Sequence, residues 1–143
     1  MRVVSICSSS SANCTYIESG GKGFLVDIGC SYKALCDGLA LAGRGTENIN
    51  AVFITHEHSD HIAGLKMLTK KLNVPVYASE GTLNMIVSKD KASEGADLHT
   101  VDDIGNAPVN VKAHAFRTPH DSAESTDYTF SDGESKIAIC TDL

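Results

Sequence analysis

The amino-acid sequence predicts an α/β fold, a layered sandwich of sheets and helices, from three features of its pattern. Short strands open the chain, amphipathic helices then alternate with apolar runs typical of buried strands, and the last third again has the pattern of strands. This order of elements favours a layered sandwich over a helical bundle. With 143 residues, the chain is one ordinary domain or part of a larger one.

Three strands are expected before the first helix. Residues 2–7 form the first strand, and a serine-rich loop separates it from the second, residues 14–18. The pair Gly20-Gly21 makes a turn into the third strand, residues 24–28. Ser31 is then expected to cap a helix whose apolar residues fall on one face: Tyr32, Leu35, Cys36, Leu39 and Ala40.

The middle of the chain alternates strands with helices. Residues 51–54 are a continuous apolar run, as expected of a strand buried on both faces. A helix marked by Ile62, Leu65, Leu68 and Leu72 follows, and it ends before Val74-Pro75 because a residue that precedes proline disfavours helix. Residues 76–78 are a brief strand, and Ser79 is expected to cap a helix carrying Leu83, Ile86 and Val87. Further strands are expected near Val101 and over residues 109–116, 128–130 and 136–140.

The composition bears on the partners and the cellular location of the protein. The net charge is 12 − 18 = −6, which argues against a broadly basic nucleic-acid surface, although bound metal ions would add positive charge locally. No stretch approaches the roughly 20 apolar residues that span a bilayer, and the N-terminus has no apolar region of signal-peptide length. We therefore expect a cytoplasmic protein without membrane association, whose five cysteines are reduced and mostly buried.

Three of the six histidines lie within one short segment, His56-Glu57-His58-Ser59-Asp60-His61, directly after the buried strand. Residues two apart in an extended segment point the same way, so His56 and His58 can share one metal ion. Asp60 and His61 lie where the end of the strand turns into a helix, so their side chains can face a point beside that metal ion. Imidazole and carboxylate suit zinc, iron and manganese, and the four donors could serve two adjacent ions. The alternative is a polar surface turn that is rich in histidine by chance.

This segment resembles the signature of the metallo-β-lactamase-fold superfamily. The resemblance implies an αββα sandwich with two divalent metal ions, zinc favoured and manganese or iron as alternatives, at the edges of its sheets. Asp27, in Val26-Asp27-Ile28-Gly29, matches an early aspartate that braces the histidine loop. A turn-forming aspartate before glycine is the other interpretation of Asp27.

Two later residues extend the resemblance. His120, in Thr118-Pro119-His120-Asp121, matches the third histidine, which would complete the first metal site with His56 and His58. Asp142, after an apolar strand, resembles the aspartate that bridges both metals. The rival to His120 is His114, but a lone histidine inside a strand is more often packed or half-exposed. His99 is expected at the surface, and Asp121 is left open between a partner of a metal ligand and a solvated carboxylate.

Within the superfamily, Ser8-Ser9-Ser10-Ser11-Ala12-Asn13 looks like the Ser-Gly-Ser-x-Gly-Asn loop of the YycJ/WalJ-type group, and Thr118-Pro119-His120-Asp121-Ser122 looks like its third-histidine segment. That group consists of exonuclease-like hydrolases related to the RNase Z and phosphodiesterase branches. Here serine and alanine replace the two loop glycines, which reduces the freedom of the backbone. A plain serine-rich loop is the alternative.

The resemblance covers nearly all 143 residues but only the first part of the family pattern. The later histidine that completes the second metal site has no counterpart, because only Leu143 follows Asp142. We therefore expect residues 1–143 to be the N-terminal portion of a single metallo-β-lactamase-fold domain, cut after the bridging-aspartate strand.

The resemblance implies a metal-dependent hydrolase. Two metals roughly 3.5–4 Å apart would share a water and lower its pKa towards about 7. The favoured substrate is a phosphodiester, in DNA or RNA, and the residues expected to act in catalysis are Asp60 and Asp142. One alternative is hydrolysis of a thioester, lactone or β-lactam by the same chemistry. Another is a fragment that binds metal but catalyses nothing. The oligomeric state is left open.

Overall fold

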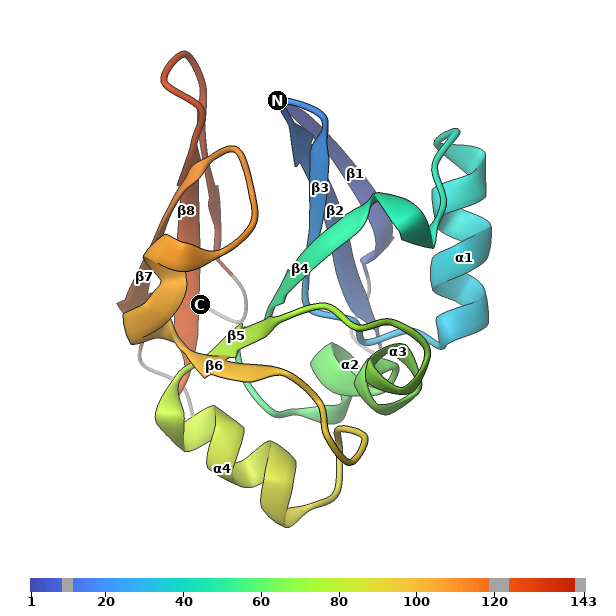
Figure 1. The fold of residues 1–143 in the computed structure, drawn as a ribbon, viewed down its shortest axis with the longest axis vertical. Coiled ribbons are helices and arrows are strands. Elements are labelled where there is room, and N and C mark those ends of the chain that lie inside the picture. The colour runs from blue at the N-terminus through green and yellow to red at the C-terminus, as the bar shows by residue number, and fades with distance from the viewer. Residues whose placement is uncertain (9–11, 119–123, 141–143) are drawn as a thin grey trace.

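The computed structural model describes residues 1–8, 12–118 and 124–140, and its strands form two sheets (Figure 1). Sheet A has six strands in the order β1-β2-β3-β4-β5-β6. They are β1 (Arg2–Ser8), β2 (Asn13–Ser19), β3 (Lys22–Val26), β4 (Ile49–Phe53), β5 (Val76–Ala78) and β6 (Leu98–Thr100). Sheet B has three antiparallel strands, β7 (Lys112–Arg117), β8 (Thr126–Ser131) and β9 (Lys136–Ile139).

The direction of the strands in sheet A brings two loops together. β1, β2 and β3 pair antiparallel, whereas β3, β4, β5 and β6 pair parallel. The carboxyl ends of neighbouring parallel strands lie at the same edge of a sheet. Val26 at the end of β3 is the Cα partner of Phe53 at the end of β4. The residues that follow each strand, including Asp27 and the histidine segment, therefore meet at this edge.

Two of the helices begin directly after the serines that the sequence indicates as caps. The helices are α1 (Tyr32–Leu41), α2 (Ser59–Ile62), α3 (Leu65–Lys71) and α4 (Glu80–Ser88), with short 3-10 helices η1 (Thr46–Asn48) and η2 (Val101–Asn106). The Ser31 side chain accepts a hydrogen bond from the Ala34 N–H at 3.1 Å, and that of Ser79 accepts one from the Thr82 N–H at 3.3 Å. Both predicted caps are confirmed, because each satisfies an N–H that the first helical turn leaves without a partner.

The single helix expected from residue 62 to residue 72 is wrong, because the chain forms α2 and α3 with a break at Ala63 and Gly64. The Gly64 N–H donates to the carbonyl oxygen of Ile28 at 2.9 Å, and a Cβ at this position would overlap the carbonyl oxygen of Cys30. The break thus follows from close packing onto the segment after β3. The strand expected near Val101 is also shifted, since β6 ends at Thr100 and η2 begins at Val101.

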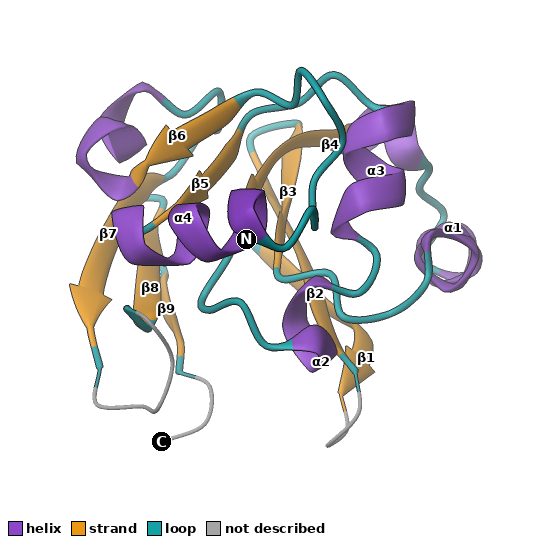
Figure 2. Cartoon of the chain, turned by 90° about the horizontal axis from the view of Figure 1, so that it is seen from below, coloured by secondary structure: helices purple, strands orange, loops and turns teal. Residues whose placement is uncertain are grey.

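The described residues build three layers, helices, sheet A and sheet B, which confirms the predicted α/β class (Figures 1 and 2). One core lies between the helices and sheet A and includes Leu35, Leu65 and Ile86. A second core lies between the two sheets, where Phe24 and Phe53 pack against Phe130 with ring centroids 4.7 and 5.2 Å away. Among the described residues, no α-helix covers the outer face of sheet B, where the resemblance implies the fourth layer.

Two expectations about individual residue types can be compared with the structure. All five cysteines are free, and Cys14 and Cys30 are buried as expected, but Cys140 is exposed and Cys7 and Cys36 are only half-buried. Within the described part of the chain, no helix has the length and apolar character that crossing a bilayer requires.

Candidate metal centre

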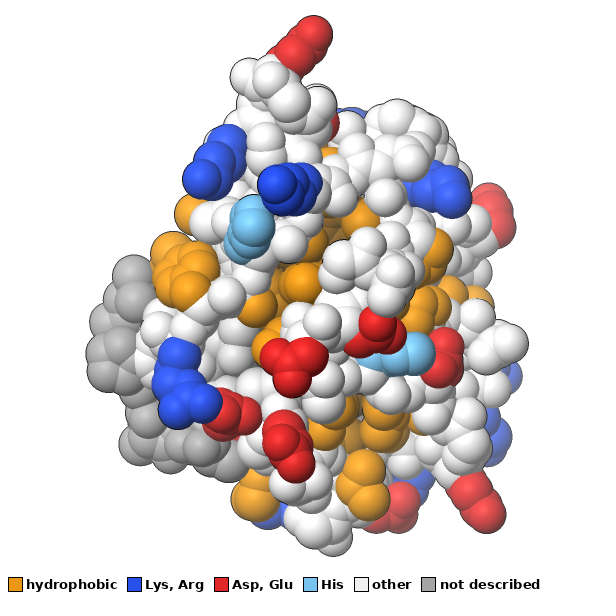
Figure 3. All heavy atoms as spheres, turned by 60° about the vertical axis from the view of Figure 1, so that its left-hand side comes forward, with side chains coloured by type: hydrophobic (Ala, Val, Ile, Leu, Met, Phe, Trp, Pro, Cys, Tyr) orange, Lys and Arg blue, Asp and Glu red, His pale blue; other side chains and the backbone are white. Residues whose placement is uncertain are grey.

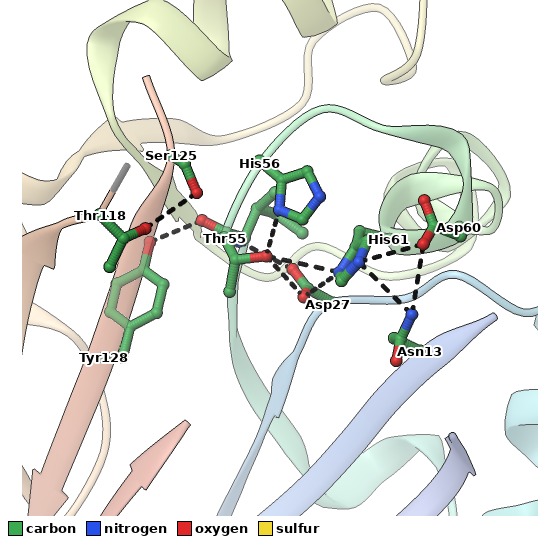
Figure 4. A network of polar contacts seen from close by, with 10 residues as sticks. Asn13, Asp27, Thr55, His56, Asp60, His61, Thr118, Ser125 and Tyr128 are labelled. Carbon is green, nitrogen blue, oxygen red and sulfur yellow. Dashed lines mark hydrogen bonds and ion pairs between the residues drawn. The ribbon is translucent and has the colours of Figure 1, made fainter. Parts of the chain in front are cut away.

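The candidate site is the segment from Thr55 to His61, called the histidine loop here, which joins β4 to α2 at the carboxyl edge of sheet A (Figure 4). Thr55, His56 and His61 are fully buried. His58 is the residue before the first turn of α2, with an extended backbone (φ −65°, ψ 146°), and Asp60 lies in that turn. His56 and His58 therefore follow the buried strand β4, and Asp60 and His61 lie in the short helix α2.

The donor atoms of this loop converge. One ligand atom each from His56, His58 and Asp60 lies within 4.8 Å of the other two. The ring centroid of His56 is 4.7 Å from that of His58 and 4.0 Å from that of His61. Nε2 of His61 lies 3.3 Å from Oδ2 of Asp60. The four donors form one group rather than two separate pairs, with Asp60 facing His56 and His58 as well as His61.

Asp27 holds the histidine loop from the end of β3, where the structure places it 1% exposed. Its Oδ1 accepts from the Thr55 N–H at 2.8 Å, and its Oδ2 accepts from the Thr55 hydroxyl at 2.8 Å and from Nδ1 of His61 at 2.6 Å. Burial raises the pKa of Asp27, and the hydrogen bonds from His61 and Thr55 oppose that rise. Its φ of 62° is a left-handed conformation that aspartate tolerates better than most residues, and it turns the carboxylate towards the loop.

The same contacts define which ring nitrogens face the cluster. A carboxylate only accepts, so the Thr55 hydroxyl gives its proton to Asp27, and its oxygen accepts from Nδ1–H of His56 at 3.0 Å. Nδ1 of His61 likewise donates to Asp27. In both histidines the proton is therefore on Nδ1, and Nε2 carries the lone pair that a metal ion requires.

Asn13, at the start of β2, reaches the site from the β1–β2 hairpin. Its side-chain amide lies 3.5 Å from Oδ2 of Asp60 and 3.4 Å from Nε2 of His61. The backbone carbonyl oxygen of Asn13 accepts a hydrogen bond from the Gly29 N–H at 2.8 Å. A Cβ at Gly29 would overlap the backbone carbonyl oxygen of Asp60. The hairpin, the segment after β3 and the turn of α2 are thus packed backbone to backbone.

Sheet B approaches the loop from the other side. The Thr126 N–H donates to the carbonyl oxygen of Thr55 at 2.9 Å, and the Tyr128 hydroxyl donates to that of Ile54 at 2.7 Å. Thr118 and Ser125, joined by a hydroxyl hydrogen bond of 3.1 Å, lie beside these contacts (Figure 4). Thr118 directly precedes residues 119–123, and Ser125 lies two positions after them. His120 and Asp121 themselves, and Asp142, lie outside the described residues.

Sequence reasoning assigned no role to Thr55 or Asn13. A threonine at the end of an otherwise apolar strand, just before the first histidine, was a usable signal for a buried hydroxyl with a partner. Asn13 is the last residue of the loop that resembles the YycJ/WalJ-type group, but its contact with Asp60 spans 47 positions in the chain and no local pattern indicates it. The two histidines expected away from the site are accounted for: His114 is exposed on β7, and His99 contacts Asp97 at 2.7 Å and stacks on Tyr77.

Comparison with known proteins identifies the family. Residues 9–143, nearly the whole chain, match the sequence profile described as Metallo-beta-lactamase superfamily. The chain belongs to the metallo-β-lactamase superfamily. The resemblance drawn from the histidine segment is confirmed at this level.

Two relatives are nucleases by name. Exodeoxyribonuclease YycJ of Bacillus anthracis is 32% identical over 139 residues, covering 96% of this chain and 52% of the relative. Ribonuclease J2 of Bacillus subtilis is 30% identical over 99 residues, covering 66% of this chain and 18% of the relative. The similarity to the YycJ/WalJ group that the serine-rich loop indicates is thus confirmed, and the chain spans about half the length of the YycJ relative.

A solved structure shows the metallo-β-lactamase fold directly. The metallo-β-lactamase of Cronobacter sakazakii with a HARLDQ motif superimposes with a TM-score of 0.75 at 14% identity. The match covers 92% of this chain and 58% of that one. At this identity the likeness concerns the fold alone, and it confirms the predicted architecture.

Proposed function

We propose that the histidine loop is the metal centre of a hydrolase that cleaves phosphodiesters of nucleic acid. The observation that carries this proposal is the convergence of His56, His58 and Asp60 within 4.8 Å, in a chain whose relatives are named exodeoxyribonuclease and ribonuclease. Partly buried imidazole and carboxylate donors fit a divalent transition metal, and zinc is the metal we favour, with manganese or iron as alternatives.

We assign the donors to two ions. His56, His58 and His120 would hold the first, Asp60 and His61 would hold the second, and Asp142 would bridge them. The closeness of His61 to both His56 and Asp60 supports two adjacent positions rather than one isolated ion. Bound metal ions would lower the pKa of water and stabilise the negative charge that develops on the phosphate oxygens.

The other residues of the site act on these donors. Asp27 and Thr55 keep the protons of His56 and His61 on Nδ1, so that Nε2 faces the cluster. The Asn13 amide contacts Oδ2 of Asp60, which leaves Oδ1 to orient a nucleophile. Asp60 is therefore proposed both to bind metal and to position the attacking water.

The proposed activity belongs to a protein of the relatives' length. Because this chain covers 52% of the YycJ relative, we propose that residues 1–143 are the N-terminal portion of one domain, with further donors and substrate contacts supplied by the rest.

The proposal is tested by comparing substrate classes on one metal-loaded preparation of the full-length protein. Hydrolysis of bis-p-nitrophenyl phosphate and of end-labelled linear DNA and RNA is measured beside hydrolysis of a thioester, a lactone and a β-lactam. We expect phosphodiester turnover that disappears with a chelator and returns with zinc or manganese. Asp60→Asn should abolish it, whereas His114→Ala, which removes an exposed histidine outside the loop, should not. Faster turnover of the thioester, lactone or β-lactam would contradict the proposal.

A further inference from the structure

Three cysteines share one corner of the core, next to the end of the β1–β2 hairpin. Cys7 near the end of β1 and Cys14 in β2 are Cα partners in antiparallel pairing, and Cys30 belongs to the same hydrophobic cluster. Directly opposed residues in an antiparallel pair have Cα atoms about 4.5–5.5 Å apart. A disulfide needs Cα atoms about 4.4–6.8 Å apart. A bridge between Cys7 and Cys14 can therefore form with little movement of the strands.

The two opposed thiols differ in exposure and in acidity. Cys7 is half-buried, whereas Cys14 is 1% exposed. The hydrogen bond from the Cys14 thiol is the largest cause that lowers the pKa of Cys7 to about 6; burial opposes it and Cys30 assists. Hydrogen bonds to Cys30 and Cys7, and burial, raise the pKa of Cys14. Of the two opposed thiols, Cys7 is therefore the more accessible and the more acidic, and Cys14 is the buried partner held against it.

An accessible thiolate beside a second thiol is the arrangement of an oxidisable cysteine with a resolving partner. We propose that Cys7 and Cys14 form a modification site for hydroperoxides, a dithiol that is converted to a cross-strand disulfide. Nothing in the proposed hydrolytic function uses either residue. Cys14 follows Asn13 in the sequence, and the Asn13 amide contacts Asp60 and His61. The modification would therefore occur at the residue next to one that contacts the candidate metal centre.

The chemistry balances with hydrogen peroxide as the oxidant. The Cys7 thiolate attacks one peroxide oxygen, the O–O bond breaks, and Cys7 becomes a sulfenic acid while hydroxide leaves and takes up a proton. The Cys14 sulfur then attacks the Cys7 sulfur, an S–S bond forms, the S–O bond breaks, and the hydroxyl group leaves as water with the Cys14 proton. Two thiols lose two electrons in total, and the peroxide is reduced to two molecules of water.

The positions of Lys22 and Lys33 make the outcome readable by mass spectrometry. The metal-loaded protein is treated with limiting hydrogen peroxide, quenched with acid, unfolded, alkylated and digested with trypsin. Residues 3–22 form one tryptic peptide that contains Cys7 and Cys14, and residues 23–33 form another that contains Cys30. We expect the first peptide to lose two hydrogen atoms and to resist alkylation, while the peptide with Cys30 remains alkylated.

Cys36 and Cys140 are internal controls in the same sample. Cys140 is exposed and Cys36 is half-buried like Cys7, so accessibility alone would make them react at least as fast. Oxidation of either one at the same or lower peroxide would overturn the proposal, and so would a disulfide that links the Cys30 peptide to the first peptide.

Two variants separate the roles of the pair. Cys14→Ser should stop at the sulfenic acid of Cys7, which dimedone traps, and Cys7→Ser should leave Cys14 alkylatable after the same treatment. Cys14 oxidised as readily in Cys7→Ser as in the unchanged protein would also overturn the assignment. The mass shift in the unchanged protein requires no variant to fold.

Discussion

The two sheets hold the histidine loop in different ways. Sheet A acts on the side chains as well as on the backbone: Asp27 at the end of β3 bonds the Thr55 hydroxyl and His61 and also accepts from the Thr55 N–H, and Asn13 in β2 contacts Asp60. Sheet B acts on the backbone, since Thr126 and Tyr128 donate to carbonyl oxygens on either side of the point where β4 becomes the loop. Sheet A therefore sets the chemistry of the donors, and sheet B supports the position of the chain that carries them.

Burial separates the central strands from the outer ones within each sheet. Every residue of β5 is buried, as are four of the five in β3 and four of the six in β8, whereas no residue of β6, β7 or β9 is. The space-filling view onto the β7 side shows apolar side chains at the surface between charged ones (Figure 3), and Phe116 of β7 is 42% exposed. Tightly packed surroundings transmit small changes, so substitutions in the buried segment that follows β3 should cost more than those in β7 or β9.

The largest effect is expected from Gly29→Ala. The added Cβ would overlap the carbonyl oxygen of Asp60 and crowd the N–H of Asn13, both of which are backbone atoms. We expect a loss of about 3 kcal/mol in the free energy of unfolding, as in severe overpacking, together with weaker metal binding because the turn of α2 must move. Urea unfolding and zinc titration measure the two effects.

Gly105→Ala is the matched control for this substitution. Gly105 has open space around the position of a Cβ, so its change should alter stability by less than about 0.5 kcal/mol. Equal unfolding midpoints for the two variants would show that the backbone contact between the segment after β3 and α2 is dispensable.

The second prediction concerns Asp27→Asn. Asparagine tolerates the same left-handed backbone, so the variant removes the charge and one acceptor with little strain. Without the carboxylate, the protons of Thr55 and His61 are no longer held, and zinc affinity should fall about 10- to 100-fold. Asp90→Asn is the control, because Asp90 also has a positive φ but is an exposed partner of Lys66. A similar fall in affinity for both variants would contradict the bracing role of Asp27.

These contacts also explain what the sequence could and could not predict. The meeting of Asp27 with the histidine segment was predictable, because apolar runs that precede both imply neighbouring buried strands. The break between α2 and α3 was not, since the apolar spacing continues through Gly64 and only the tertiary contacts with Ile28 and Cys30 interrupt the helix. Local patterns predicted the elements and caps, whereas contacts between distant segments determined where the elements end.

A third, smaller effect is expected from Thr55→Val. Valine has nearly the same shape as threonine but lacks the hydroxyl that donates to Asp27 and accepts from His56. The N–H of residue 55 still bonds Asp27, so the loop should keep its place while His56 loses the partner of its Nδ1–H. We expect zinc affinity to fall about 10-fold, the lower end for such partners. Thr55→Ser retains the hydroxyl and should restore binding; if both variants bind alike, the hydroxyl does not position His56.

The smallest effect is expected on the sheet B side, from Tyr128→Phe. The change removes one buried hydrogen bond, to the carbonyl oxygen of Ile54, and leaves the ring in the core between the sheets. Stability should fall by about 1 kcal/mol, the usual net worth of such a bond, and zinc affinity should stay unchanged because no donor loses its partner. Tyr32→Phe, a half-buried position on α1, should cost less than about 0.5 kcal/mol and serves as the control. Weaker zinc binding with unchanged stability in Tyr128→Phe would mean that sheet B also sets the donors, and the division between the two sheets would be wrong.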